Sequence, residues 1–437
     1  MLTLEKLKLY FERAIHFPAA NREMFLNAQS FSRQGKASME TTIAALHLMG
    51  GGSLKKELND IGLDMTASAF VQSRSKISPE AFRYVFRWFN HLCRSHDWKT
   101  YRGYRLLAVD GSCINMAFNP KTSSFVRSDT HPQGGYNQLH LNTMFDVENN
   151  VYYDAHVTPQ PCADEIGALI TMLQHNEFLH KQLIICDRGY ESYNLFAHLM
   201  RKKNVAFLCR VKQSKSAMRE IAKLPMQELD VDVSFTVTTT QTNEDKAENR
   251  IFIQTHANRK RQYSPKTKPS RWDFPSPYDM KFRVVRFLLP SGEYETLATS
   301  LSRNFSVEEI KELYHKRWGI ETSFRNLKYT VGLSYLHGKS NEFVEQEIYA
   351  ALNVYNFCSR AVNAIVLKKR AENIHIYKIN FKMAVYLCRK YLKDPEMGGV
   401  ELLAQLEKYV EPVRPGRMDK RNLRPKGFTG FIYRVAA

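Results

Sequence analysis

The sequence lacks the marks of a secreted, membrane-spanning or zinc-binding chain. Its seven cysteines are scattered, and none forms a CxxC pair or another Cys/His ligand spacing, which indicates buried thiols in a reducing cytoplasm. Residues 1–15 carry charges throughout and show no apolar core before a cleavage site, so we expect no signal peptide. No run of about 18 uncharged apolar residues occurs, so we expect no membrane span and no membrane partner.

Negative charge is also scarce. The 437 residues include 63 Lys and Arg but only 44 Asp and Glu, which gives a formal net charge of +19. Hydrophobic residues make up 43% of the chain, so this is a globular composition with ample core and not a disordered one. The basic excess indicates a polyanionic partner, most often nucleic acid. A generally basic surface is the alternative.

The chain divides by pattern into five regions. Residues 1–98 read as short helices, and the basic stretch Ser68–Lys76 after a turn suits either a helix-turn-helix reader or a plain helical packing domain. Apolar strands, a hairpin and helices follow, and they predict an α/β core. A β-rich insertion and a helical part come next. The predicted regions are a helical DNA-binding domain (1–98), the first part of the core (99–212), the insertion (213–302), the second part of the core (303–370), and a C-terminal helical region with a basic tail (371–437).

Three acids carry the chemistry. Asp110 and Asp187 each end a short apolar strand, where open α/β sheets place catalytic groups, and Glu321 lies on a helix after the insertion. Converging carboxylates hold Mg²⁺ or Mn²⁺, and a pair of such ions activates water for phosphodiester cleavage. The alternative for either aspartate is a turn former or a helix cap.

A helical stripe accompanies Glu321. Tyr314, Arg317, Glu321 and Lys328 lie at offsets 0, 3, 7 and 14, which place them on one face of a continuous helix. Arg and Lys beside a carboxylate suit a site that binds metal and phosphate oxygens together. A solvated face with i,i+4 ion pairs is the alternative.

Three motifs give the sequence a family likeness. They are Ala108–Ser112, Cys186–Tyr190, and Tyr314–Lys328, and the last matches Tyr-x2-Arg-x3-Glu-x6-Lys at every named position. With these motifs the sequence resembles bacterial insertion-sequence transposases of the DDE class, in the family called insertion sequence four. The resemblance covers roughly residues 30–435 and includes the helical start and the basic tail.

The resemblance implies a fold and a site. It implies an α/β fold with a ribonuclease-H-like catalytic core, interrupted by a β-rich insertion. It makes Asp110, Asp187 and Glu321 the metal-binding catalytic triad, holding two Mg²⁺ or Mn²⁺ ions. Tyr314, Arg317 and Lys328 would contact DNA near the cleaved end. An aromatic residue of the insertion would stack on a flipped base. The candidates are Trp272, Tyr294 and, in the basic loop 258–277, Tyr263.

Other polar residues have simpler interpretations. Arg188 follows the second aspartate directly, where it can reach a phosphate. His140 and His315 are interpreted as structural, with a contact to metal or DNA as the alternative. Glu165 is interpreted as a helix-dipole acid that is also a candidate further carboxylate. The arginines and lysines of the tail are interpreted as a solvated basic segment that can neutralise DNA phosphates.

The sequence thus predicts a transposase that binds the terminal inverted repeats of its element, cuts them and joins the 3′ ends to target DNA. Two ends must be processed together, so a homodimer is expected in the synaptic complex, and DNA hairpins are expected intermediates by the resemblance. The expected location is the bacterial cytoplasm, at the nucleoid. Two alternatives are a metal-dependent nuclease on the same fold and a non-enzymatic DNA-binding protein derived from a transposase.

Overall fold

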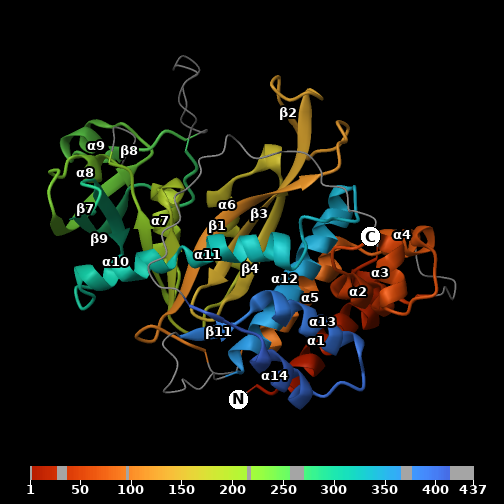
Figure 1. Cartoon of the computed structure of the whole chain (residues 1–437). Helices are drawn as coiled ribbons and strands as arrows, with labels where there is room; N and C mark the ends of the chain where they lie inside the picture. Colours follow the sequence, from red (N-terminus) through yellow and green to blue (C-terminus); the bar gives the residue numbers. More distant parts are fainter. Residues whose placement is uncertain are drawn as a thin grey trace.

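The computed structural model describes residues 2–26, 37–94, 98–213, 218–255, 270–365 and 376–413. One ten-stranded sheet runs through the molecule, with helices on both faces (Figure 1). The strand order is β2-β3-β1-β5-β6-β10-β9-β7-β8, and β4 pairs with β3. The strands of this sheet are β1 (Arg105–Met116), β2 (Phe125–Arg127), β3 (Gly135–Asp146), β4 (Val151–Pro159), β5 (Gln182–Cys186), β6 (Val205–Arg210), β7 (Leu229–Thr238), β8 (Ile251–Phe252), β9 (Tyr278–Leu288) and β10 (Tyr294–Thr299). A separate pair consists of β11 (Tyr377–Ile379) and β12 (Val410–Pro412).

The pairing is mixed, as expected for an α/β fold. β1 runs antiparallel to β3 and parallel to β5, and β5 runs parallel to β6. The strands expected as an insertion form where the pattern predicted them, but they extend the sheet of the core. β10 pairs antiparallel with β6 on one side and with β9 on the other.

Helices flank the sheet and connect its strands. They are α1 (Leu4–Ala20), α2 (Met39–Leu48), α3 (Leu54–Asp60), α4 (Ala67–Ser75), α5 (Pro79–Leu92), α6 (Glu165–His175), α7 (Tyr193–Arg201), α8 (Arg219–Ala222), α9 (Asn243–Ala247), α10 (Val307–Lys316), α11 (Gly319–Arg325), α12 (Asn341–Asn363), α13 (Phe381–Lys393) and α14 (Gly399–Lys408). In the described part of the chain, no helix combines the length and the apolarity that a membrane crossing needs.

The alternation of side chains along β1 sorts the helices onto two faces. Leu107 and Val109 pack with residues of α6 and α7 on one face. Ala108 points to the other face and packs with the cluster that includes α11 and α12. Position 110 therefore shares the face of α11, which places the first predicted acid on the same side as Glu321.

The N-terminal helices share their core with the C-terminal ones. Buried residues of α1, α2, α4 and α5 form one cluster with residues of α12, α13 and α14. The link is polar as well: Arg74 on α4 is buried and donates hydrogen bonds to Gln346 and Glu347 of α12. Arg74, which the sequence suggested as part of a DNA-reading helix, instead holds two helices together. DNA binding by residues 1–98 stays a prediction.

The segment that carries the stripe is not one continuous helix, so that part of the prediction is wrong. α10 ends at Lys316, α11 begins at Gly319, and a π-helix spans Asn326–Thr330. The N–H groups of Arg317 and Trp318 bond to carbonyls three residues back, which tightens the chain between α10 and α11. The helix start at Ser306 is confirmed, with the capping box to Glu309.

Candidate active site

Asp110 and Asp187 meet because of strand register. The parallel pairing places Ala108 opposite Ile185, and each strand reaches its aspartate two residues further on. Asp110 accepts a hydrogen bond from the N–H of Gly111, at 2.8 Å. Asp187 follows β5 and accepts one from the N–H of Gly189, also at 2.8 Å. The two acids of the sequence prediction thus lie on neighbouring strands.

Arg317 links the first acid to Glu321. Its guanidinium lies 3.2 Å from Oε1 of Glu321 and 3.8 Å from Oδ2 of Asp110. The contact with Glu321 is the i,i+4 ion pair expected on a helix face, but the contact with Asp110 joins the helix to the sheet. The structure therefore brings the acid on β1, the acid on α11 and the arginine between them to one place.

Tyr314 and Lys328 border this group. The guanidinium carbon of Arg317 lies 5.9 Å from the ring centroid of Tyr314, and burial raises the pKa of that tyrosine to about 12. Lys328 Nζ donates to the carbonyl of Cys113 on β1 at 2.9 Å, and burial lowers its pKa. Although the helix is broken, the four stripe residues remain connected: Arg317 contacts Tyr314, Glu321 and Asp110 of β1, and Lys328 contacts Cys113 of β1.

A fourth carboxylate, Glu165, belongs to the same neighbourhood. Its Oε1 lies 3.2 Å from Nε2 of His140 on β3. A Cβ placed on Gly111 would meet both side chains, and one placed on Gly189 would lie 3.9 Å from Glu165 Oε2. The sequence suggested a helix-dipole role for this residue because it opens α6. Only the tertiary placement of α6 beside the ends of β1 and β5 brings Glu165 to the acids, and no local sequence pattern indicates it.

The acidic cluster changes the protonation of its members. Burial raises the pKa of Asp110 to about 6, and Asp187 and Glu165 push it in the same direction. The Gly111 N–H and Arg317 oppose the rise. For His140, burial alone lowers the pKa, but hydrogen bonds to Cys113 and Glu165 outweigh it and raise the pKa to about 10. Like charges crowded in this way are what a bound cation relieves.

The donors suit a hard cation by their chemistry. Carboxylate oxygens of Asp110, Asp187 and Glu321 are the ligands that Mg²⁺ and Mn²⁺ prefer. Within the described ranges, no group of three such side chains is already spaced to hold an ion. Arg317 lies between two of the three acids, Asp110 and Glu321.

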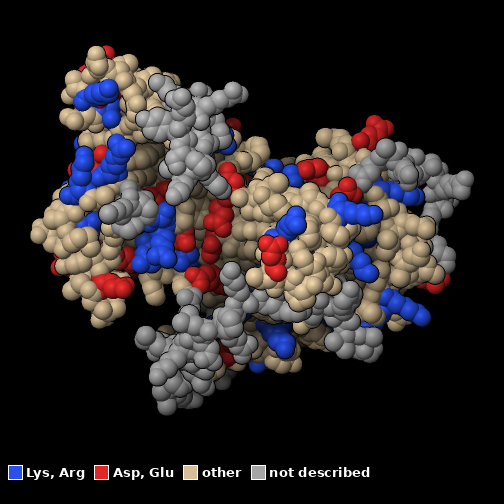
Figure 2. Space-filling view, turned by 90° about the horizontal axis from the view of Figure 1, so that it is seen from above, with Lys and Arg blue, Asp and Glu red and all other residues tan. Residues whose placement is uncertain are grey.

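A basic cavity adjoins the second aspartate. It has a volume of about 740 Å³, and its walls include Arg188, Arg210, Lys212 and Tyr294. Arg188 is exposed and follows Asp187 directly, so the cavity begins at the acidic cluster. Figure 2 shows acidic side chains gathered beside a basic patch, in the hollow between the part with β7–β9 and the helical part.

The predicted aromatic residues lie in different surroundings. Tyr294 lines the basic cavity. Trp272 packs against Phe274 and Tyr278, with ring centroids 5.4 and 5.5 Å away, and its Nε1 is buried. Tyr263 and most of the basic loop lie outside the described residues, as does the basic tail from 414.

Comparison with known proteins gives this geometry a family. A comparison with curated proteins gave no significant match. Among solved structures, the chain is similar to a piggyBac transposase in a synaptic complex with hairpin DNA, at 12% identity over 97% of this chain and 89% of that chain. The TM-score of 0.44 is too low for any residue to be placed by it. The family model for the transposase DDE domain matches residues 101–357, more than half of the chain and all three acids. The chain therefore belongs to the DDE-domain transposases.

Proposed function

We propose that this transposase binds the terminal inverted repeats of its element, cleaves the DNA there and joins the freed 3′ ends to target DNA. Two observations support the proposal: Arg317 contacts both Asp110 and Glu321, and the pairing of β1 with β5 brings Asp187 next to the strand that carries Asp110. The family match supports the same reaction class.

The triad would hold two Mg²⁺ or Mn²⁺ ions. Such ions supply an activated water and a counter-charge for the leaving oxygen. One of these ligands would come from β1, one from the residue that follows β5, and the third from α11. Glu165 is positioned to orient His140 or to add a further oxygen ligand.

The basic groups would hold the DNA. Arg317 offers a two-pronged contact to a phosphate once it leaves Glu321, and Lys328 offers a point charge. Arg188 starts the basic cavity that continues to Lys212. Tyr294, which lines that cavity, is better placed than the packed Trp272 to stack on an unpaired base.

The finer assignments belong to the same proposal. They are membership of the insertion-sequence-four family, bacterial origin, a ribonuclease-H-like core, hairpin intermediates, a homodimeric synaptic complex and action at the nucleoid. The family, the core and the hairpin intermediates rest on the resemblance that the three sequence motifs carry, and the homodimer rests on the need to process two DNA ends together.

The test is an end-processing assay with the full chain. Purified protein, Mg²⁺ or Mn²⁺ and labelled DNA that carries the element's terminal repeats are incubated with a circular target. We expect cleavage at the repeat ends and covalent joining to the target. Cleavage without joined product would favour the nuclease alternative, and binding without cleavage would favour the non-enzymatic one.

The stacking residue is tested separately with 2-aminopurine beside the cut. Tyr294→Ala should abolish the fluorescence change that wild-type protein causes, while Trp272→Ala should leave it intact. The reverse result would assign the contact to Trp272.

A further inference from the structure

A second cavity lies away from the acidic cluster. It has a volume of about 650 Å³ and lies between α5, α12, β4 and the segment before β5. Arg105 and Gln182, which open β1 and β5, form part of its wall. Asp110 and Asp187 lie further along those strands, so this cavity belongs to the opposite end of the strand pair.

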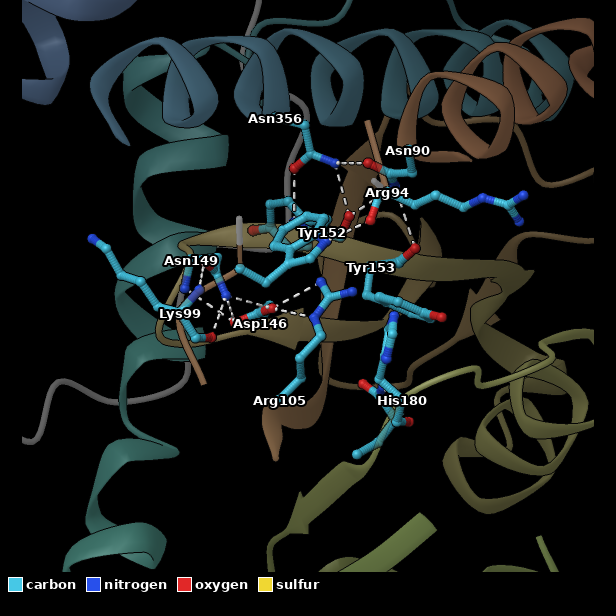
Figure 3. Close-up of polar contacts among 12 residues, drawn as sticks. Asn90, Arg94, Lys99, Arg105, Asp146, Asn149, Tyr152, Tyr153, His180 and Asn356 are labelled. Atoms are coloured by element: carbon cyan, nitrogen blue, oxygen red, sulfur yellow. Dashed lines mark hydrogen bonds and ion pairs between the residues drawn. The ribbon is translucent and has the colours of Figure 1, made fainter. Parts of the chain in front are cut away.

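Two of its four arginines have carboxylate partners. Arg105 contacts Asp146 at 2.8 Å, and Asn149 donates to the same carboxylate (Figure 3). Figure 3 also shows Tyr153 and His180 beside Arg105. Arg87 lies 3.5 Å from Asp154, whose other oxygen accepts from Asn176. The charges of these two arginines are therefore balanced.

Arg360 and Arg94 differ from these two arginines in the described part of the chain. Arg360 is only 8% exposed, and among the described residues no carboxylate lies within 4.0 Å of either guanidinium. Arg360 donates to Oδ1 of Asn90 at 3.1 Å, and its guanidinium carbon lies 4.8 Å from the ring centroid of Trp98. The guanidinium carbon of Arg105 lies 3.8 Å from the same ring, so two cations share one aromatic surface. Burial lowers the pKa of Arg360, and Arg105 adds to the decrease, while Cys93 and Asp146 oppose it.

Two buried polar atoms of the wall also lack partners. They are Nε of Arg360 and Oε1 of Gln182, neither of which has a hydrogen-bond partner among the described residues. A buried guanidinium without a counter-charge is costly, and proteins retain such groups where a ligand supplies the charge. The remaining acid of the wall, Glu177, is exposed.

We propose that this cavity binds a phosphate group through Arg360 and Arg94. Phosphate oxygens match the donor fork of a guanidinium, and the volume admits a group the size of a nucleotide. The phosphate is carried either by a free nucleotide or by a DNA strand, and both sources present the same chemistry to the two arginines.

Three variants of the full chain test the site. Arg360→Met removes a buried charge that has no carboxylate within 4.0 Å among the described residues, so the protein should fold with equal or higher thermal stability. Arg94→Ala changes an exposed side chain and tests the site without touching the core. Lys223→Ala removes an exposed cation that follows α8, outside the cavity, and serves as the matched control for net charge.

The readout is calorimetric titration with inorganic phosphate and with AMP, in metal-free buffer at constant ionic strength. We expect wild type and Lys223→Ala to bind alike, Arg360→Met to bind about tenfold more weakly, and Arg94→Ala to lose a smaller factor. Equal binding by wild type, Arg360→Met and Arg94→Ala, or no binding by wild type, would overturn the proposal.

A competition experiment identifies the source of the phosphate. Displacement of AMP from wild type by a single-stranded oligonucleotide, with no such effect in Arg360→Met, assigns the site to DNA. Retention of AMP under the same conditions assigns it to a free nucleotide. The binding assay contains no metal, so a negative result would not argue against the proposed cleavage reaction. A negative result in the cleavage assay would likewise not argue against phosphate binding in this cavity.

Discussion

Two arginine–glutamate pairs in this molecule differ in how completely they are satisfied. Arg74 is buried, bonds to Gln346, Glu347 and the carbonyl of Phe343, and Glu347 also accepts from backbone N–H groups. Arg317 instead reaches 3.2 Å to Glu321 and 3.8 Å to Asp110, two acids whose side chains are 31% and 25% exposed.

The completeness of hydrogen bonding distinguishes the Arg74–Glu347 pair, which is structural, from the Arg317–Glu321 pair, which we propose is functional. Every donor and acceptor of the Arg74 group has a nearby partner inside the protein, so nothing is left for a ligand. The Arg317 group leaves carboxylate oxygens facing solvent beside like charges, which is the condition that a cation or a phosphate would improve. The comparison predicts that changes at Arg74 act on stability and changes around Arg317 act on catalysis.

The largest effect is expected at the three acids. Asp110→Asn, Asp187→Asn and Glu321→Gln should each lower the cleavage rate at least about a thousandfold, or ~4 kcal/mol, because each removes a metal ligand. DNA binding and thermal stability should stay near wild type. Glu312→Gln, an exposed acid on α10, is the control. A single amide variant that cleaves at the wild-type rate would remove its acid from the triad.

The next effect is expected at the satisfied pair. Arg74→Ala should lower the free energy of unfolding by about 3–5 kcal/mol, because it leaves Glu347 buried without its counter-charge. Urea unfolding of the two proteins measures the difference. Adding Glu347→Gln should restore part of the loss. If Arg74→Ala unfolds at the wild-type urea concentration, burial of this pair contributes little.

Arg74 also shows where the sequence stops being informative. Its neighbours in the chain are polar and basic, so local pattern favours a solvent-facing helix, and only the packing of α12, about 270 residues away, buries it. The acids were predictable because strand ends and a specific motif fix them. The strands, the α/β class and the helix start at Ser306 were predictable from alternation and capping for the same local reason.

Features that depend on distant pairing were not predictable. The strands of the insertion extend the core sheet because β10 pairs with β6, a contact that no local pattern encodes. Glu165 joins the acidic cluster only because α6 begins beside the two strand ends. The break between α10 and α11 is a local feature that was missed for another reason: its i,i+3 hydrogen bonds do not alter the hydrophobic periodicity.

The contribution of Glu347 to stability can be measured from the pH dependence of unfolding. Burial alone raises the pKa of Glu347, but Arg74 and His337 outweigh it and lower the pKa to about 2. A depressed pKa stabilises the fold above the ordinary value of 4.5 and loses that contribution as the pH falls toward 2. The loss should be about 3 kcal/mol. Unfolding at several pH values in this window measures it, and Glu347→Gln should flatten the dependence; an equally steep curve in that variant would assign it to other acids.

A smaller catalytic effect is expected at Arg317. Arg317→Gln should lower cleavage at saturating DNA by about 10–100-fold, because one charged contact to the reacting phosphate is lost. Arg303→Gln removes an exposed arginine that pairs with Asp230 and should leave cleavage unchanged. If Arg317→Gln weakens only DNA affinity and saturating DNA restores the rate, the arginine is a general backbone contact.

The smallest effect is expected at an exposed pair, and it completes the comparison. Arg102 lies 3.0 Å from Glu309, donates to the carbonyl of Asn304 and has a side chain that is 48% exposed. Water screens such a pair, so Arg102→Ala should lower the free energy of unfolding by no more than about 1 kcal/mol, and less at high salt. Urea unfolding at low and high salt measures both. Arg74→Ala and Arg102→Ala each remove one guanidinium from one glutamate, so their difference compares a buried pair and its hydrogen bonds with an exposed pair. If the two cost the same, completeness of the buried network is not what distinguishes Arg74, and the contrast with Arg317 would rest on the acids alone.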